Sequence, residues 1–208
     1  MLTSLEDKYR FLFLTLTVRN CTKDKLSETI DSMMAGWNRF LGLKKIEGFN
    51  KGYIRSLEMT YNKKDDTYHP HIHALICVES NYFTDEALYL KHEDLINLWQ
   101  KSAQLDYQPN VRIEILKEKR IDRKAYIETL KYSIKPQPEV EGEQLLEYIT
   151  KLKGRRLISF GGIVKKLRKL NLDDLNDIEV DEKPRKVLAA VIMRMDVNAG
   201  VYRTEKIL

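Results

Sequence analysis

The chain has 208 residues, of which 36 are lysine or arginine and 31 are aspartate or glutamate, giving a formal net charge of +5. It has no apolar run long enough to span a membrane and no signal-like N-terminus, so we expect a cytoplasmic protein without a membrane partner. Cys21 and Cys77 are its two cysteines, a number that disfavours a disulfide scaffold. The modest positive charge favours a polyanionic partner.

The first two predicted elements are a strand and a helix. Residues 9–18 are rich in β-branched and aromatic side chains, which is typical of a strand. Residues 23–43 then carry apolar side chains at helical spacing, among them Leu26, Ile30 and Trp37. This second segment is therefore predicted to be an amphipathic helix.

A β-hairpin is predicted next. Residues 52–61 and 71–78 are apolar and β-rich, and the segment between them has the polar composition of a turn. We place the centre of the turn near Asp65 and Asp66, which fixes the expected pairing of the two strands.

Three metal ligands are predicted on this hairpin. His71 and His73 alternate along one strand, so both project from the same face. With the predicted turn, Glu58 falls opposite His73 on that face. Two imidazoles and a carboxylate would accept Mg²⁺, Mn²⁺, Co²⁺ or Zn²⁺ and leave coordination positions open, which indicates catalysis. His69 is in phase but precedes Pro70, so we expect it to support the ligands or to contact substrate.

A helix at residues 91–104, a strand at 111–116 and a helix at 123–134 follow, and Pro136 stops the last helix. His92 is predicted to be a solvated surface residue. The order strand-helix-strand-strand-helix-strand-helix predicts an α+β fold. In such a fold, helices pack on an antiparallel sheet of the ferredoxin-like or RNA-recognition-motif (RRM-like) type.

The helix at residues 123–134 offers a nucleophile. Glu128 is four positions before Tyr132 and Lys135 is three positions after it, so the three side chains share one helix face. A metal that polarises a phosphate, with the Lys135 ammonium nearby, would make attack by the Tyr132 phenol feasible. The alternatives are an ordinary core tyrosine at position 132, and Tyr126, which lies roughly on the other side of the helix.

Residues 149–170 are basic and contain no acid. An exposed helix face normally mixes both signs of charge, so we favour DNA contact over a solvated face. Gly161 and Gly162 interrupt the stretch and are predicted to let the backbone approach phosphates. The predicted DNA-binding residues are Lys151, Lys153, Arg155, Arg156, Lys165, Lys166, Arg168 and Lys169.

Three segments together resemble the motifs of HUH endonucleases in order and approximate spacing: residues 13–18, 69–75 and 128–135. The chain more closely resembles the replication initiator (Rep) proteins of small rolling-circle plasmids of Gram-positive bacteria. Residues 152–162 also resemble the segment that follows the third motif in those initiators.

The resemblance implies the HUH endonuclease fold and a DNA endonuclease and strand transferase that uses Mn²⁺ or Mg²⁺. Tyr132 would nick one strand at a double-strand origin, forming a 5′-phosphotyrosyl link and freeing a 3′-OH that primes replication. Glu128 would activate the water that ends the cycle. Thr15 and Thr17, in the first motif, are interpreted as sheet and DNA-positioning residues.

We expect a nuclease core at residues 1–138 and a basic extension at 139–208 that packs on the core and serves DNA binding or oligomerisation. Residues 186–195 and 201–204 predict a terminal hairpin. The expected partners are plasmid origin DNA and a host helicase, since the sequence has no phosphate-cradling glycine loop for ATP; a homo-oligomer is also compatible with the sequence. The alternatives are a single-tyrosine HUH transposase and a non-catalytic nucleic-acid module with a structural metal.

Overall fold

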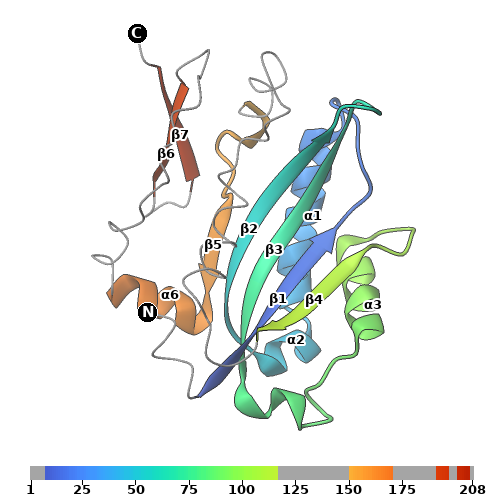
Figure 1. Cartoon of the computed structure of the whole chain (residues 1–208), viewed down its shortest axis with the longest axis vertical. Coiled ribbons are helices and arrows are strands. Elements are labelled where there is room, and N and C mark those ends of the chain that lie inside the picture. The colour runs from blue at the N-terminus through green and yellow to red at the C-terminus, as the bar shows by residue number, and fades with distance from the viewer. Residues whose placement is uncertain (1–7, 117–149, 171–190, 197–200, 207–208) are drawn as a thin grey trace.

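A five-stranded antiparallel sheet is the centre of the computed structural model, which describes residues 8–116, 150–170, 191–196 and 201–206 (Figure 1). Its strands run in the order β4-β1-β3-β2-β5. Their bounds are β1 Tyr9–Thr17, β2 Asn50–Asn62, β3 Thr67–Glu79, β4 Val111–Leu116 and β5 Ile158–Gly161.

Helices complete the fold and cover the sheet. Their bounds are α1 Leu26–Leu41, α2 Lys44–Phe49, α3 His92–Ala103 and α6 Gly162–Leu170, with a short 3₁₀ helix η2 at Ser80–Phe83. The first four strands, joined by α1 and α3, have the split β-α-β arrangement of ferredoxin-like folds. The predicted α+β class with helices on an antiparallel sheet is confirmed.

Most predicted elements begin or end within a few residues of their expected bounds. The short helix α2 and the strand β5 were not predicted. The expected terminal hairpin is formed by β6 (Val191–Asp196) and β7 (Val201–Lys206). The helix predicted at residues 123–134 lies outside the described residues, and among those residues no helix is long and apolar enough to cross a membrane.

One face of the sheet, here called the helix face, packs against α1 and α3. Alternation along β1 and β3 directs every second side chain to this face, where Leu12, Leu14 and Leu16 of β1 and Ile72, Ala74, Ile76 and Val78 of β3 meet the apolar stripe of α1. Figure 1 shows α1 behind β1, β2 and β3. The helices α1 and α3 lie close together at Gly36. A Cβ added there would lie only 2.9 Å from the Cα of Ala103.

The opposite face, here called the site face, is divided into an apolar half and a polar half. A small buried cluster occupies the apolar half, and it is completed by β5 and α6; its members are Phe11, Ile54, Leu75, Cys77, Ile158 and Val164. Further along the same strands, the polar half presents the histidines of β3. The fold therefore places the predicted metal ligands beside, and not beneath, the α6 segment.

Gly161 and Gly162 have a packing role that the sequence analysis did not predict. A Cβ at Gly162, whose φ is +55°, would lie 2.2 Å from the carbonyl oxygen of Lys51. A Cβ at Gly161 would lie 2.1 Å from the ring of Tyr53. The glycines let α6 and β5 approach β2. The approach of their backbone to phosphates stays a prediction.

Candidate metal centre and nucleic-acid interface

The three predicted ligands meet on the site face. The Oε2 atom of Glu58 lies 2.9 Å from Nε2 of His73 and 3.1 Å from Nε2 of His71. One ligand atom from each residue can be chosen so that all three lie within 4.8 Å of one another, and this is the only such group within the described part of the chain. β2 and β3 therefore bring the predicted ligands together.

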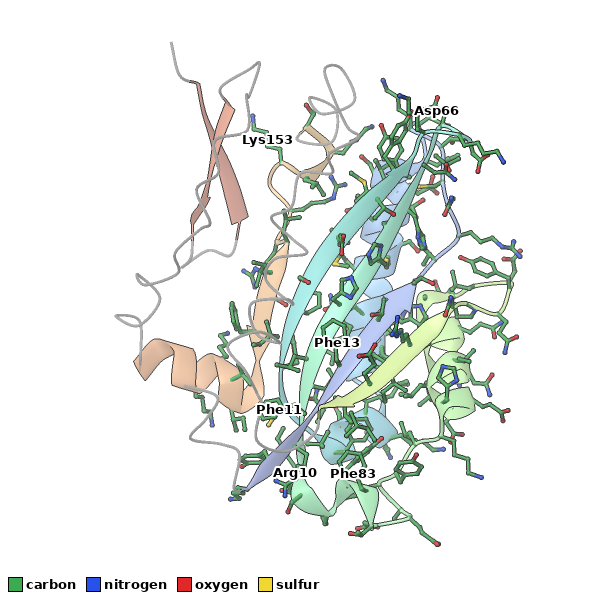
Figure 2. All side chains as sticks on the ribbon, viewed as in Figure 1. Arg10, Phe11, Phe13, Asp66, Phe83 and Lys153 are labelled. Carbon is green, nitrogen blue, oxygen red and sulfur yellow. The ribbon has the colours of Figure 1, made fainter. Side chains whose placement is uncertain are left out.

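The register of the hairpin differs from the predicted one. Glu58 pairs with His71, and Ser56 takes the position opposite His73. The turn occupies residues 63–66, so the hairpin closes slightly earlier than expected; Asp66 marks its tip in Figure 2. The partner of Glu58 moves by two residues, which keeps its side chain on the face of both histidines.

The Nε2 atoms of His71 and His73 face Glu58, and the Nδ1 atom of each ring makes a separate hydrogen bond. Nδ1 of His71 lies 3.1 Å from the carbonyl oxygen of His69. Because a carbonyl only accepts, Nδ1–H of His71 is the donor, and a neutral His71 presents the Nε2 lone pair to the site. Nδ1 of His73 lies 3.1 Å from Oγ1 of Thr15 on β1. Metal-binding histidines are commonly held in this way.

The carboxylate of Glu58 is held in its charged form. Its side chain is 13% exposed, and this burial raises the pKa, but hydrogen bonding and electrostatic interaction with His71 and His73 outweigh the burial and lower the pKa to about 2. Burial also lowers the pKa of His69, and the neighbouring His71 adds to the effect. The His69 ring lies 5.3 Å from that of His71, so His69 adjoins the cluster as predicted.

The donor set fits a divalent cation. A neutral His71 and an ionised Glu58 would bring a nitrogen lone pair and a carboxylate oxygen to 3.1 Å, an arrangement that a proton or a cation between them must stabilise. Ser56, beside His73 in the register, has a fully buried hydroxyl without a hydrogen-bond partner in the described structure. Such a hydroxyl is exceptional, since buried polar atoms usually have partners.

The predicted catalytic residues Tyr132, Glu128 and Lys135 lie outside the described residues. Their roles stay predictions. Thr15 and Thr17 belong to the sheet, as predicted, and the Thr17 hydroxyl donates to the carbonyl of Asn110 at 2.8 Å.

The basic stretch divides by environment. Lys153, Arg156, Lys165 and Lys166 are exposed, whereas Lys151 is half-buried. Arg168 and Lys169 belong to α6, but their side chains lie outside the described part.

Arg155 has an intramolecular partner. Its guanidinium donates to both carboxylate oxygens of Asp31 on α1, at 2.9 and 2.7 Å. This ion pair competes with the predicted contact between Arg155 and DNA.

Two contacts of His73 were not predicted. The Thr15 hydroxyl supports His73, and the ring of Phe13 stacks on His73 with centroids 5.5 Å apart. The alternation of side chains along β1 could have placed Phe13 and Thr15 on one face, but it does not show which strand β1 pairs with. His92 is exposed, as expected, and its Nε2 lies 2.6 Å from the carbonyl oxygen of Val111.

A ferredoxin-like sheet with two histidines and a glutamate converging on its site face defines an α+β protein with a candidate metal centre. Comparison with known sequences shows that the chain belongs to the replication protein (Rep) family, whose model matches residues 1–196. The resemblance to Rep initiators is thereby confirmed.

Individual relatives agree with this assignment. A replication protein of Staphylococcus aureus is 37% identical over 180 residues, covering 81% of this chain and 77% of the relative. A Rep protein of Streptococcus pneumoniae is 38% identical over 168 residues, covering 79% of this chain and 52% of the relative. One from Lentilactobacillus hilgardii is 35% identical over 210 residues, covering 93% and 67%. No solved structure matches the chain significantly.

Proposed function

We propose that this protein initiates rolling-circle replication of a plasmid by nicking one DNA strand at the double-strand origin in a metal-dependent reaction. Membership of the replication protein family supports the role in replication. The observation that carries the proposed chemistry is the convergence of the ligand atoms of Glu58, His71 and His73 on the site face. Three ligands leave positions open for a phosphate oxygen.

Glu58, His71 and His73 would hold Mn²⁺ or Mg²⁺, which when bound supplies charge that polarises the scissile phosphate. The Tyr132 oxygen attacks phosphorus, the bond from phosphorus to the 3′ oxygen breaks, and the tyrosine remains linked to the 5′ phosphate. The phenolic proton is lost, and a proton is taken up by the leaving 3′ oxygen. Lys135, three residues after Tyr132 in the predicted helix, would stabilise the charge that develops on the phosphate.

Glu128 would act later in the cycle. The free 3′-OH primes synthesis, and the linked strand is afterwards transferred to a new 3′-OH or released by water. The Glu128 carboxylate, four residues before the nucleophile in the predicted helix, would take a proton from that water. The nicking step and the hydrolytic step therefore depend on different residues.

The exposed cations of the basic stretch are proposed to bind the origin DNA through its phosphates: Lys153, Arg156, Lys165 and Lys166. We propose the same role in binding DNA phosphates for Lys151, Arg168 and Lys169. A host helicase would separate the strands. The reaction is proposed to take place in the cytoplasm, where plasmid DNA is replicated. Residues 1–138 are proposed to form the nuclease core, and residues 139–208 the basic extension.

Covalent capture tests the proposal. The protein is incubated with Mn²⁺ and a supercoiled plasmid that carries a family-type origin, and nicked circles and protein–DNA adducts are mapped by mass spectrometry. We expect an adduct on Tyr132 that EDTA prevents and that Tyr132→Phe abolishes. Tyr126→Phe is the matched control and should retain the adduct. A Tyr132→Phe variant that still forms the adduct would refute the assignment of the nucleophile, and tight origin binding without any adduct would favour a binding module.

The role of Glu128 has a separate test. Glu128→Ala should nick and form the phosphotyrosyl adduct at a rate near that of the wild type but hydrolyse it slowly. General base catalysis typically contributes on the order of 10²- to 10⁴-fold, so release of the adduct should slow within that range. A pulse-chase of the isolated adduct measures this rate, and release at the normal rate would exclude Glu128 as the base.

A further inference from the structure

Within the described structure, β1 reaches the metal centre through the side chain of Thr15. The register pairs Thr15 with His73, and the two side chains are hydrogen-bonded at 3.1 Å through Oγ1 and Nδ1. The contact joins residues 58 positions apart in the sequence. His71, in contrast, is held by the backbone of its own strand, through the carbonyl of His69. The His71 ring is thus held by the backbone of its own strand, whereas the His73 ring is held by a side chain of β1.

A second residue of β1 also contacts His73, at the face of the ring. Phe13, labelled in Figure 2, lies on the same face of β1 as Thr15, and its ring is inclined by 23° to that of His73. A stacked ring limits the tilt of the imidazole but leaves it free to turn within its own plane. The hydrogen bond at Nδ1 removes that freedom, because a bond to one edge of the ring fixes the direction of the other edge.

We propose that Thr15 is a positioning residue for the metal centre. With a metal bound, its hydroxyl would accept a hydrogen bond from Nδ1–H of His73. This selects the tautomer whose Nε2 lone pair faces the site, in place of the hydrogen bond that Nε2 makes with Glu58 in the described structure. The proposal rests on the proposed metal-dependent function. It assigns Thr15 a role within the protein, distinct from the DNA-positioning role suggested by the sequence.

Thr17 provides a matched control on the same strand. It is in phase with Thr15, and the register pairs it with the other histidine, His71. Its hydroxyl, however, donates to the Asn110 carbonyl at 2.8 Å. Thr17→Val therefore removes a hydroxyl of the same type, on the same face, without removing a hydrogen bond to a ligand.

The test is Mn²⁺ binding to the whole chain, measured by isothermal titration calorimetry. Removing the partner of a metal-binding histidine typically weakens affinity about 10- to 100-fold, and we expect that loss in Thr15→Val. Thr15→Ser keeps the hydroxyl and should bind close to wild type, and Thr17→Val should bind as wild type does. Equal affinity in Thr15→Val and wild type would overturn the proposal, as would the same loss in Thr17→Val. Failure of the wild type to bind Mn²⁺ would instead reject the metal centre itself, and Thr15's role with it.

A spectroscopic measurement separates positioning from a general effect on folding. In the Zn²⁺-loaded protein, the Nδ1–H proton of His73 should exchange slowly with solvent in wild type and Thr15→Ser. In Thr15→Val it should exchange fast, while circular dichroism and thermal unfolding stay near wild type, because valine suits a strand and matches threonine in shape. A folded Thr15→Val protein that retains the protected proton would overturn the proposal.

Discussion

Arg155 and Arg156 are adjacent in the sequence but differ in environment. The Arg155 side chain is 24% exposed and binds Asp31 through both carboxylate oxygens. Arg156 is exposed, and its backbone carbonyl accepts a hydrogen bond from the buried Arg55 at 3.1 Å. The first side chain is therefore directed toward α1, whereas the second is free to meet a phosphate.

This difference predicts different effects on DNA binding. Arg156→Ala should reduce the slope of log affinity against log salt by about one, as expected for one lost phosphate contact. Arg155→Ala should leave that slope near wild type and lower the free energy of unfolding by up to about 1 kcal/mol, the usual range for a partly exposed ion pair. Fluorescence anisotropy over a range of KCl concentrations measures the slopes, with Asp31→Ala as a control for the pair. Equal slope changes in the two arginine variants would contradict this division.

Cys77 reports on the apolar half of the site face. It is fully buried, and burial raises the pKa of its thiol to about 12. Because the reactive thiolate is the form that burial disfavours, Cys77 in a Cys21→Ser background should react very slowly with a thiol reagent at pH 8. Denaturant should restore rapid labelling with the midpoint of unfolding. Fast labelling of the folded protein would show that β5 and α6 do not cover this half.

At the scale of elements, the docking of α6 on β2 depends on close backbone contact. Gly162 adopts a left-handed conformation and lies against the carbonyl of Lys51, and Gly52 on β2 faces it through an isolated bridge. A side chain at position 162 would add a steric clash with backbone to the conformational penalty.

Gly154 offers the comparison, since its φ is +76° but a Cβ there would have no atom within 4 Å. Gly154→Ala should cost about 1–2 kcal/mol of unfolding free energy, the usual penalty of a left-handed non-glycine residue. Gly162→Ala should cost more, because β2 or α6 must also move. Urea unfolding of both variants measures the difference. Similar losses would show that the backbone at position 162 relaxes freely.

The hairpin shows how far the sequence could predict the site. Alternation and the predicted turn together identified the common face of Glu58, His71 and His73. That conclusion survived a register error because a shift of two residues keeps the face. The hydrogen bond between Thr15 and His73 could not be predicted, since alternation does not say which strand β1 joins. The short helix α2 was missed because its six residues are too few to display a helical period.

At the scale of the whole molecule, the two faces of the sheet differ in what they contribute. The helix face carries the large core, whereas the polar half of the site face carries the Glu58 carboxylate, 13% exposed, between two imidazoles. A charge so placed is best stabilised by a cation or by protonated partners. We therefore expect the stability of the chain to depend on metal.

Metal should raise the free energy of unfolding. A ligand that binds only the folded state adds about 2.7 kcal/mol at one hundred times its dissociation constant. Mn²⁺ should accordingly raise the midpoint of thermal unfolding, and EDTA should reverse the shift. Glu58→Gln, which removes the ligand charge but keeps the shape, should show little shift. The same shift in wild type and Glu58→Gln would place the stabilising ion elsewhere.

The origin of the ligands within one hairpin has a consequence for how the protein folds. Glu58 and His73 meet across only 15 residues, whereas the contact of His73 with Thr15 spans 58. Closing a short loop loses less chain entropy, and isolated hairpins form on the order of 1–10 μs. The ligands should therefore gather as soon as β2 and β3 pair, and acquire their final orientation only when β1 docks. An early folding state would contain the cluster of Glu58, His71 and His73 before the contact with Thr15 gives the His73 ring its final orientation.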